Sequence, residues 1–387
     1  MAAREPFDAV LTVSGESARV SAPNLLDLKR DLRGDSIQAL IPIYTPTSPI
    51  SLLFNLRGID VISSFAANST ELVVSFPQAG ITTSFDGGTR DQSVSLFREF
   101  IRDGGSNGGA LLKAYAKYSP IDPVAGNPNS LLYQMAANDF ELGKLSSLSG
   151  CDCGWSAQPI IHQFQVGLRG GRAFSDGFDT TIVKLPLRYS YSPNSNWALI
   201  IDAPFSYLRN GGASSIAASI GTGLRLPITS NWSLTSIVRF GTAGTMDLCT
   251  SGNFFSTGFL SQFNWKWGSF VLSLSNYAGY FTSTNFWLTG LNFNYHIQTY
   301  SLKNGLSLTS CDWLFLCNRP LNWNVNFVDT YFTKGGLFIR HYDEIGVNLI
   351  TNYINPCLNY DALIFGFTYQ FGEKHYRGYM FNLDYQF

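Results

Sequence analysis

The sequence predicts a transmembrane β-barrel of about twelve antiparallel strands, preceded by a small α+β segment. Along many segments of the second half, apolar and polar residues alternate with a period of two, which places them on opposite faces of a strand. The sequence contains no run of about 18 apolar residues that could form a membrane-spanning helix. The chain of 387 residues is 15% aromatic and only 14% charged, against about 25% charged residues in globular domains.

The clearest alternation lies in the last strand, Tyr379 to Phe387. Every second residue there is aromatic or leucine, and most residues between them are polar. A strand with lipid on one face and water on the other requires this pattern. The last strand of a soluble sandwich is the alternative, but few soluble strands expose five large apolar side chains on one face.

Similar segments begin near residue 160 and are separated by turn residues. They span 160–170, 179–191, 196–208, 213–228, 231–241, 253–267, 269–281, 286–300, 304–310, 322–332, 336–350, 361–371 and 378–387. Single-chain bacterial barrels have an even number of strands, so we expect twelve. The two weakest segments are 160–170, which could be a lead-in, and 304–310, which is short.

The composition changes near residue 150, so we expect an N-terminal segment over 1–153 and a barrel over 154–387. Stretches rich in β-forming residues predict strands in the first part at Ile37–Tyr44, Ile50–Leu56, Ile59–Ala66 and Glu71–Phe76. Apolar spacing and the glycines and prolines that follow predict helices over Asp91–Asp103, Ala110–Tyr118 and Leu131–Phe140.

The six cysteines weakly favour an oxidising compartment. Four of them fall in three loops that emerge on the same side of the barrel if the strands alternate as numbered. The simplest expected pairs are Cys311 with Cys317 and Cys249 with Cys357. Cys151 and Cys153 form a C-x-C pair, but no second pair of ligands has matching spacing, so we expect no metal site.

Basic residues collect on the inward-facing positions of the predicted strands. They are Arg169, Lys184, Arg188, Arg225, Arg239 and Lys266. Such a stripe could bind anionic solutes or an acidic plug. The alternative is that the charges only solvate a small barrel and pair with one another. The net charge of −1 gives no electrostatic case for nucleic acid.

We expect no enzymatic activity and no cofactor. His296 shares an inward face with two asparagines, which is the wrong side for a lipid substrate. His341 shares a strand face with Asp343, but no serine is placed nearby. The P-loop and the dinucleotide fingerprint are missing from the sequence, and the glycine-rich stretch Gly104–Gly109 follows a predicted helix, so we expect a flexible loop there.

The barrel half, Gln158 to Phe387, resembles the autotransporter-type β-domain, a twelve-stranded barrel that ends on an aromatic residue. It is most similar to the solitary form without a long secreted passenger. The resemblance implies that the barrel-assembly machinery reads Tyr385 and Phe387, and that Leu131–Phe140 could be the helix that threads the pore. It also implies a place among the lipids of the bacterial outer membrane.

The first residues lead into no apolar export signal, so we expect the signal peptide to be absent from this chain. A cytoplasmic protein is the competing explanation. The expected function is a structural or translocator barrel whose own N-terminal segment occupies the pore. The alternatives are a small-solute channel that prefers anions and, third, a barrel-borne hydrolase.

Overall fold

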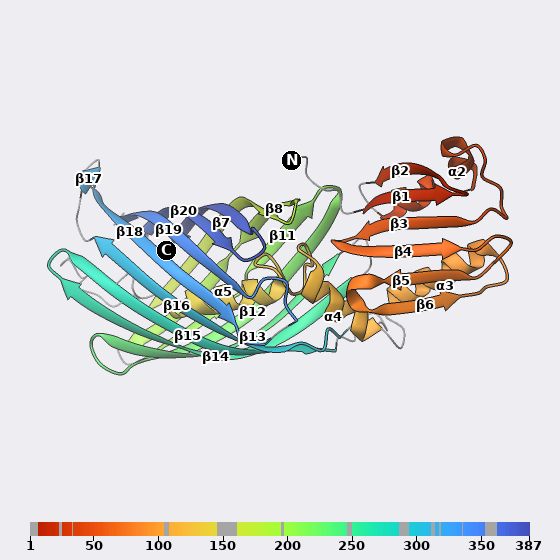
Figure 1. Cartoon of the computed structure of the whole chain (residues 1–387). Helices are drawn as coiled ribbons and strands as arrows, with labels where there is room; N and C mark the ends of the chain where they lie inside the picture. Colours follow the sequence, from red (N-terminus) through yellow and green to blue (C-terminus); the bar gives the residue numbers. More distant parts are fainter. Residues whose placement is uncertain are drawn as a thin grey trace.

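The computed structural model describes residues 7–22, 25–32, 34–103, 108–144, 161–194, 197–245, 250–285, 294–310, 314–316, 319–334, 336–352 and 362–387. It has two parts, an N-terminal α+β module and a β-barrel that meets the module at one end (Figure 1). The expected boundary at residues 153 and 154 lies outside the described residues.

The module is built on a six-stranded antiparallel sheet, with helices packed beside it. Its strand order is β2-β1-β3-β4-β5-β6. The strands are β1 (Phe7–Val13), β2 (Glu16–Ala22), β3 (Ile50–Leu56), β4 (Ile59–Phe65), β5 (Leu72–Phe76) and β6 (Ile81–Phe85). The helices are α1 (Leu25–Asp31), α2 (Gly34–Leu40), α3 (Arg90–Asp103) and α4 (Gly108–Tyr118), with a 3₁₀ turn at Pro77–Ala79. The predicted α+β character is confirmed, and β3, β4, β5, α3 and α4 match predicted elements.

The prediction of a strand over Ile37–Tyr44 is wrong, because helix α2 occupies residues up to Leu40. The apolar residues Ile37 and Ile41 are four positions apart, which is a helical spacing. Both are buried in one cluster with Leu11 and Val13 of β1. Contact with the sheet therefore outweighs the β-propensity of the isoleucines.

The barrel is a closed antiparallel sheet of twelve strands, as predicted. It closes where β21 pairs with β7. In chain order its elements are β7 (His162–Ser175), β8 (Phe178–Leu185), β9 (Leu187–Asn194), β10 (Trp197–Asp202), β11 (Phe205–Asn210), β12 (Ala213–Pro227), β13 (Trp232–Thr245), β14 (Thr250–Trp267), β15 (Phe270–Thr284), β16 (Gln298–Ser310), β18 (Arg319–Phe332), β19 (His341–Asn352), β20 (Ala362–Gly372) and β21 (Arg377–Gln386). The short β17 (Leu314–Leu316) pairs only with β18.

Two of the twelve strand positions are each filled by two consecutive elements. β8 and β9 both pair with β7, and β10 and β11 both pair with β12. Pro186 and Pro204 lie at the two breaks, and proline has no backbone N–H for the ladder. The Gly167 N–H donates to the Pro186 carbonyl over 2.9 Å and keeps the wall joined there.

Thirteen segments were predicted because one strand of the barrel was divided into two. The segments predicted at 286–300 and 304–310 are not separate strands, because β16 runs unbroken from Gln298 to Ser310. The predicted break between them covered residues 301–303, yet Lys303 points into the lumen and its neighbour Asn304 points outward, as in a continuous strand. Conversely, the segment predicted at 160–170 is a full strand, β7, rather than a lead-in.

The outer surface of the barrel is apolar. Alternate residues of β20 and β21 are strongly exposed, including Phe365 at 49% and Phe381 at 61%. The residues between them, such as Asp384 and Gln370, are buried on the inner face. This is the lipid-facing and lumen-facing alternation of a membrane barrel. Among the described residues, no helix is long and apolar enough to cross a membrane.

The barrel has two ends that differ in what they carry. At the end named here the C-terminal rim, β7 begins and β21 ends, with Gln386 opposite Gln165. The other end, the module rim, meets the N-terminal module. There the Phe338 N–H donates to the Ala116 carbonyl over 2.8 Å, and the Arg57 side chain donates to the Thr245 hydroxyl.

Candidate functional site

Helix α5 (Leu131–Gly143) lies inside the barrel, against the inner faces of β12, β13 and β14 (Figure 1). Glycines in the wall allow the close approach. A Cβ at Gly223 would come within 2.3 Å of the Leu142 side chain, and one at Gly305 within 2.5 Å of Phe140. The predicted helix over Leu131–Phe140 is thus present, and it fills part of the lumen.

A buried ionic network ties α5 to the wall. Asp139 of α5 accepts a hydrogen bond from Nε of Arg239 on β13 over 2.6 Å, and neither side chain is exposed to solvent. Arg239 also reaches Asp202 on β10 over 2.8 Å. The hydroxyls of Tyr277 and Ser256 donate to the second oxygen of Asp139 over 2.9 and 3.2 Å. Each partner satisfies a charge that would be costly to bury alone.

The linker between α4 and α5, residues 119–130, is buried at the module rim. Asp122 accepts hydrogen bonds from the Val124 and Ala125 N–H groups and from the Tyr295 hydroxyl, the last over 3.0 Å. Burial raises the pKa of Asp122 to about 6. The Ile339 N–H donates to the Gly126 carbonyl over 2.8 Å. The linker is therefore anchored by both side chains and backbone at the mouth of the barrel.

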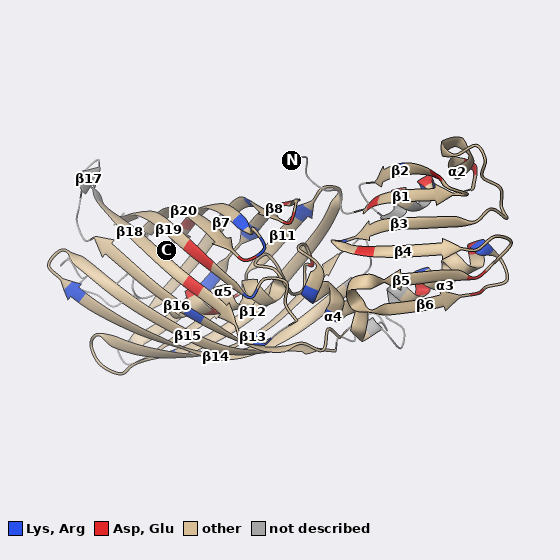
Figure 2. Cartoon of the chain, in the orientation of Figure 1, with Lys and Arg blue, Asp and Glu red and all other residues tan. Residues whose placement is uncertain are grey.

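On the side of α5 that faces away from β12–β14, a polar cavity of about 170 Å³ remains. Its charged lining comprises Lys144, Arg169, Lys184, Arg188, Lys303, Glu141, Glu344 and Asp384. Lys144 and Glu141 of this lining form an ion pair of 3.0 Å, whereas the pairs of Arg169 with Asp384 and of Lys303 with Glu344 are longer, at 3.7 and 3.5 Å. Acidic and basic residues lie close together on the strands of this region, near α5 (Figure 2). The cavity is thus polar, charged and more basic than acidic.

The six predicted basic residues do not form one continuous stripe. Arg169, Lys184 and Arg188 line the cavity, whereas Arg239 forms the buried ion pair with Asp139. Arg225 lies closer to the C-terminal rim, where it donates to the Ser233 hydroxyl over 3.0 Å. Lys266 lies at the exposed end of β14. The shear of the barrel separates residues that share a parity.

Several residues of this site were missed from the sequence. Lys303 fell in the predicted break between two strands. Asp139 lies in the helix that the resemblance places in the pore and Glu141 just after its predicted end, but neither was assigned an ionic partner. The signal that could have found the two acids is their position in an otherwise apolar helix, opposite a surplus of inward-facing bases.

The predicted assembly residues lie at the closing seam. Phe387 and Phe164 exchange two backbone hydrogen bonds of 2.7 and 2.9 Å, and their rings stack at 5.6 Å between centroids. The Tyr385 ring lies 5.3 Å from that of Phe387. The C-terminal residue thus extends the pairing of β21 with β7 by one step beyond Gln386.

The cysteines of both expected disulfides lie outside the described residues. The strand ends around them are described, however. Thr245 and Thr250 flank Cys249 at the module rim, whereas Asn352 flanks Cys357 at the C-terminal rim. These strand ends lie at opposite rims rather than on one side as expected, because β16 is one strand and not two. The pair Cys311 and Cys317 stays a prediction.

Comparison with known proteins gives likeness in structure alone. No family model and no curated protein matches the chain. Among solved structures, the β-domain of the Bordetella autotransporter BrkA is 11% identical with a TM-score of 0.45, covering 59% of this chain and 99% of that one. The translocator domain of NalP from Neisseria meningitidis is 12% identical with a TM-score of 0.44, covering 66% and 95%. An outer-membrane channel from Pseudomonas putida is 12% identical with a TM-score of 0.43, covering 60% and 97%.

The closed wall and the apolar outer surface decide the class of protein. The chain is a transmembrane β-barrel. A sheet without edges and with lipid-facing alternation is the only β-structure that satisfies its backbone inside a bilayer. The features particular to this barrel are the helix in its lumen and the module on one rim.

Proposed function

We propose that this outer-membrane barrel has an autotransporter-like structural or translocator role, and that its own N-terminal segment occupies the pore. The observation that carries the proposal is the seating of α5 in the lumen by the pair of Asp139 and Arg239. The buried linker at the module rim adds a second closure through Asp122 and Tyr295. The proposal assigns no catalytic role to the chain.

Conductance in planar bilayers tests the occupied pore. We expect the full chain to conduct poorly and a chain that begins near residue 154 to conduct well. A matched full-length variant, Asp139→Asn, should conduct more than the wild type, while Glu99→Gln on α3 should not. High conductance of equal size in the full and shortened chains would favour an open channel. Low conductance in both chains would be compatible with a structural role and would exclude the N-terminal segment as the plug.

We also propose that the module is displayed outside the cell. Single-chain barrels with an even strand count keep both barrel termini in the periplasm, and here both barrel termini lie at the C-terminal rim. The module is at the opposite rim. An epitope inserted at the exposed β1–β2 turn, Ser14–Gly15, should then bind antibody on intact cells. The same epitope at the turn Gly268–Ser269 should not, and the reverse result would invert the orientation.

An anion-preferring channel is the second candidate function, favoured by the lining of the cavity. Among the described residues, Lys184 has no ion-pair partner, and the residue directly opposite it, Arg169, is a second cation. Exchange of Arg169, Lys184 and Arg188 for glutamate should reverse any anion preference of the conductance. Arg225→Glu is the matched control, because Arg225 does not line the cavity. Unchanged selectivity in the triple variant would exclude this candidate.

A further inference from the structure

A row of polar side chains crosses the outer, lipid-facing surface of the barrel. Asn276, Asn304, Asp329 and Asp343 lie directly opposite one another on β15, β16, β18 and β19. Their neighbours on the same face are exposed and apolar, with Leu302 and Leu306 at 41% and 49% and Phe327 and Ile345 at 42% and 44%. Ionisable groups on a lipid-facing surface are costly, so two carboxylates in such a row require a partner.

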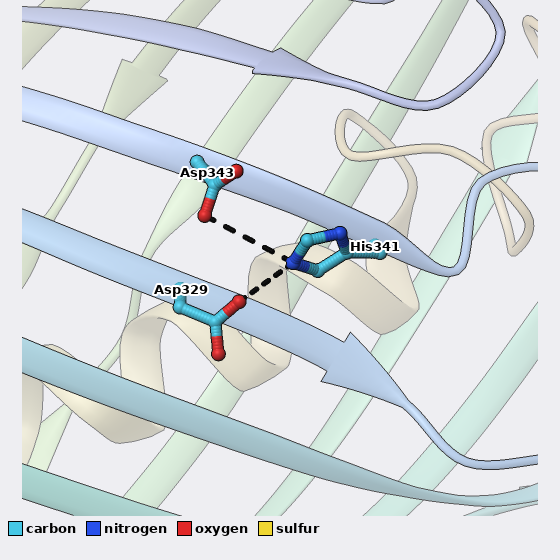
Figure 3. Close-up of side chains that lie close together, drawn as sticks. All are labelled: Asp329, His341 and Asp343. Carbon is cyan, nitrogen blue, oxygen red and sulfur yellow. Dashed lines mark hydrogen bonds and ion pairs between the residues drawn. The ribbon is translucent and has the colours of Figure 1, made fainter.

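The row ends in a convergence of three side chains near the module rim (Figure 3). Nε2 of His341 lies 2.7 Å from Oδ1 of Asp329 and 3.9 Å from Oδ1 of Asp343. One nitrogen or oxygen atom from each residue lies within 4.8 Å of the other two. Asp329 comes from β18, and the other two come from β19, so the sheet pairing itself holds the three groups together.

We propose that Asp329, His341 and Asp343 bind a divalent transition-metal cation, best matched by Zn²⁺, on the outer face of the barrel. One imidazole nitrogen and two carboxylate oxygens are zinc ligands, and three protein ligands leave a fourth position open. Calcium prefers six to eight oxygen ligands, which this group does not offer. A cation would also neutralise the two negative charges when His341 is neutral. The expectation of no metal site weighed only the cysteine spacing.

The two asparagines of the row orient the carboxylate of Asp329. Nδ2 of Asn304 donates to Oδ2 of Asp329 over 3.3 Å, which leaves Oδ1 directed at His341. Nδ2 of Asn276 in turn donates to Oδ1 of Asn304 over 2.8 Å. Hydrogen bonds to the free oxygen of a ligating carboxylate fix its orientation in metal sites. The competing arrangement is a protonated His341 that pairs with the two carboxylates and leaves no place for a cation.

Zn²⁺ titration of the full-length protein in detergent micelles, without a polyhistidine tag, tests the site. Calorimetry should give one equivalent of Zn²⁺ per chain. His341→Gln, Asp329→Asn and Asp343→Asn should each weaken binding roughly tenfold or more. His162→Gln is the matched control: His162 is also an exposed histidine, paired with the Tyr189 hydroxyl at 2.8 Å, and its loss should leave binding unchanged. Each variant should keep the fast gel migration of an unheated, folded barrel.

Two further measurements keep the outcome decisive if a ligand variant fails to fold. X-ray absorption of the wild type loaded with Zn²⁺ should report one imidazole ligand at about 2.0–2.1 Å, with oxygen ligands besides. Asn304→Leu, which matches the neighbouring leucines and touches no cation, should weaken Zn²⁺ binding roughly tenfold. Absence of binding at millimolar Zn²⁺, binding unaffected by His341→Gln, or tighter binding of Ca²⁺ than of Zn²⁺ would each overturn the proposal.

Discussion

Replacing Asp139 with asparagine should loosen α5 from the lumen. The carboxylate and Arg239 are both fully buried and 2.6 Å apart. Removing one partner of a buried pair costs about 3–5 kcal/mol of stability, because the other charge stays buried. Asp202 still contacts Arg239 at 2.8 Å and compensates part of that charge. We therefore expect the lower end of the range, about 3 kcal/mol, for Asp139→Asn.

Urea unfolding of the refolded protein in lipid vesicles measures this loss as a lower transition midpoint at unchanged slope. Glu99→Gln on the exposed face of α3 is the control, and such surface changes stay within about 0.5 kcal/mol. A loss below about 1 kcal/mol for Asp139→Asn would refute the reasoning, since surface substitutions away from special features already reach half of that value. It would show that the pair does not hold the helix.

Three other outcomes are expected. Deletion of Phe387 removes two backbone hydrogen bonds to Phe164 and should slow the appearance of the fast-migrating folded band; an unchanged rate would show that the C-terminus is not an assembly signal. Mass mapping under non-reducing conditions should find Cys311 bonded to Cys317, a bridge that requires Cα atoms within about 7 Å, and two free thiols would exclude it. Burial raises the folded-state pKa of Asp122 to about 6, so the folded state holds this proton more tightly than the unfolded state. The stabilising effect of this proton should be complete below pH 4 and be lost as the pH rises to 6, by roughly 3 kcal/mol, relative to Asp122→Asn. If the free energy of unfolding, measured with urea, depends on pH in the same way in both proteins over that range, the expectation is wrong.

Much of the architecture was predictable because lipid and water impose a period of two. The inward and outward sets of β21 follow directly from that rule, as Asp384 and Phe381 show. Turn propensity was a poorer guide. Residues 301–303 were taken for a break between two strands, but β16 continues through them, with Lys303 paired inward with Glu344 and Asn304 bonded outward to Asp329.

The contents of the lumen were less predictable, since parity gives a face but no neighbours. Arg188 and Arg225 share the inward parity, yet only Arg188 reaches the cavity. Their separation depends on the stagger of twelve strands, which sequence alone does not specify. The acidic partner of Arg239 comes from α5, one hundred residues earlier in the chain. Such a contact depends on how the helix docks, and no local pattern encodes it.

The chain at α5 is threaded through the closed barrel. At its start the chain leads to a six-stranded folded module on one rim, and at its end it continues to β7 on the other. This stretch of chain cannot leave the lumen altogether unless the module unfolds and passes through it or the seam between β7 and β21 opens. During assembly, either the wall closes around the helix or the module folds only after its chain has passed through the lumen. In the finished protein, the lumen therefore always holds some stretch of chain, and the pore widens only if α5 unfolds, shifts along the barrel or rearranges in place.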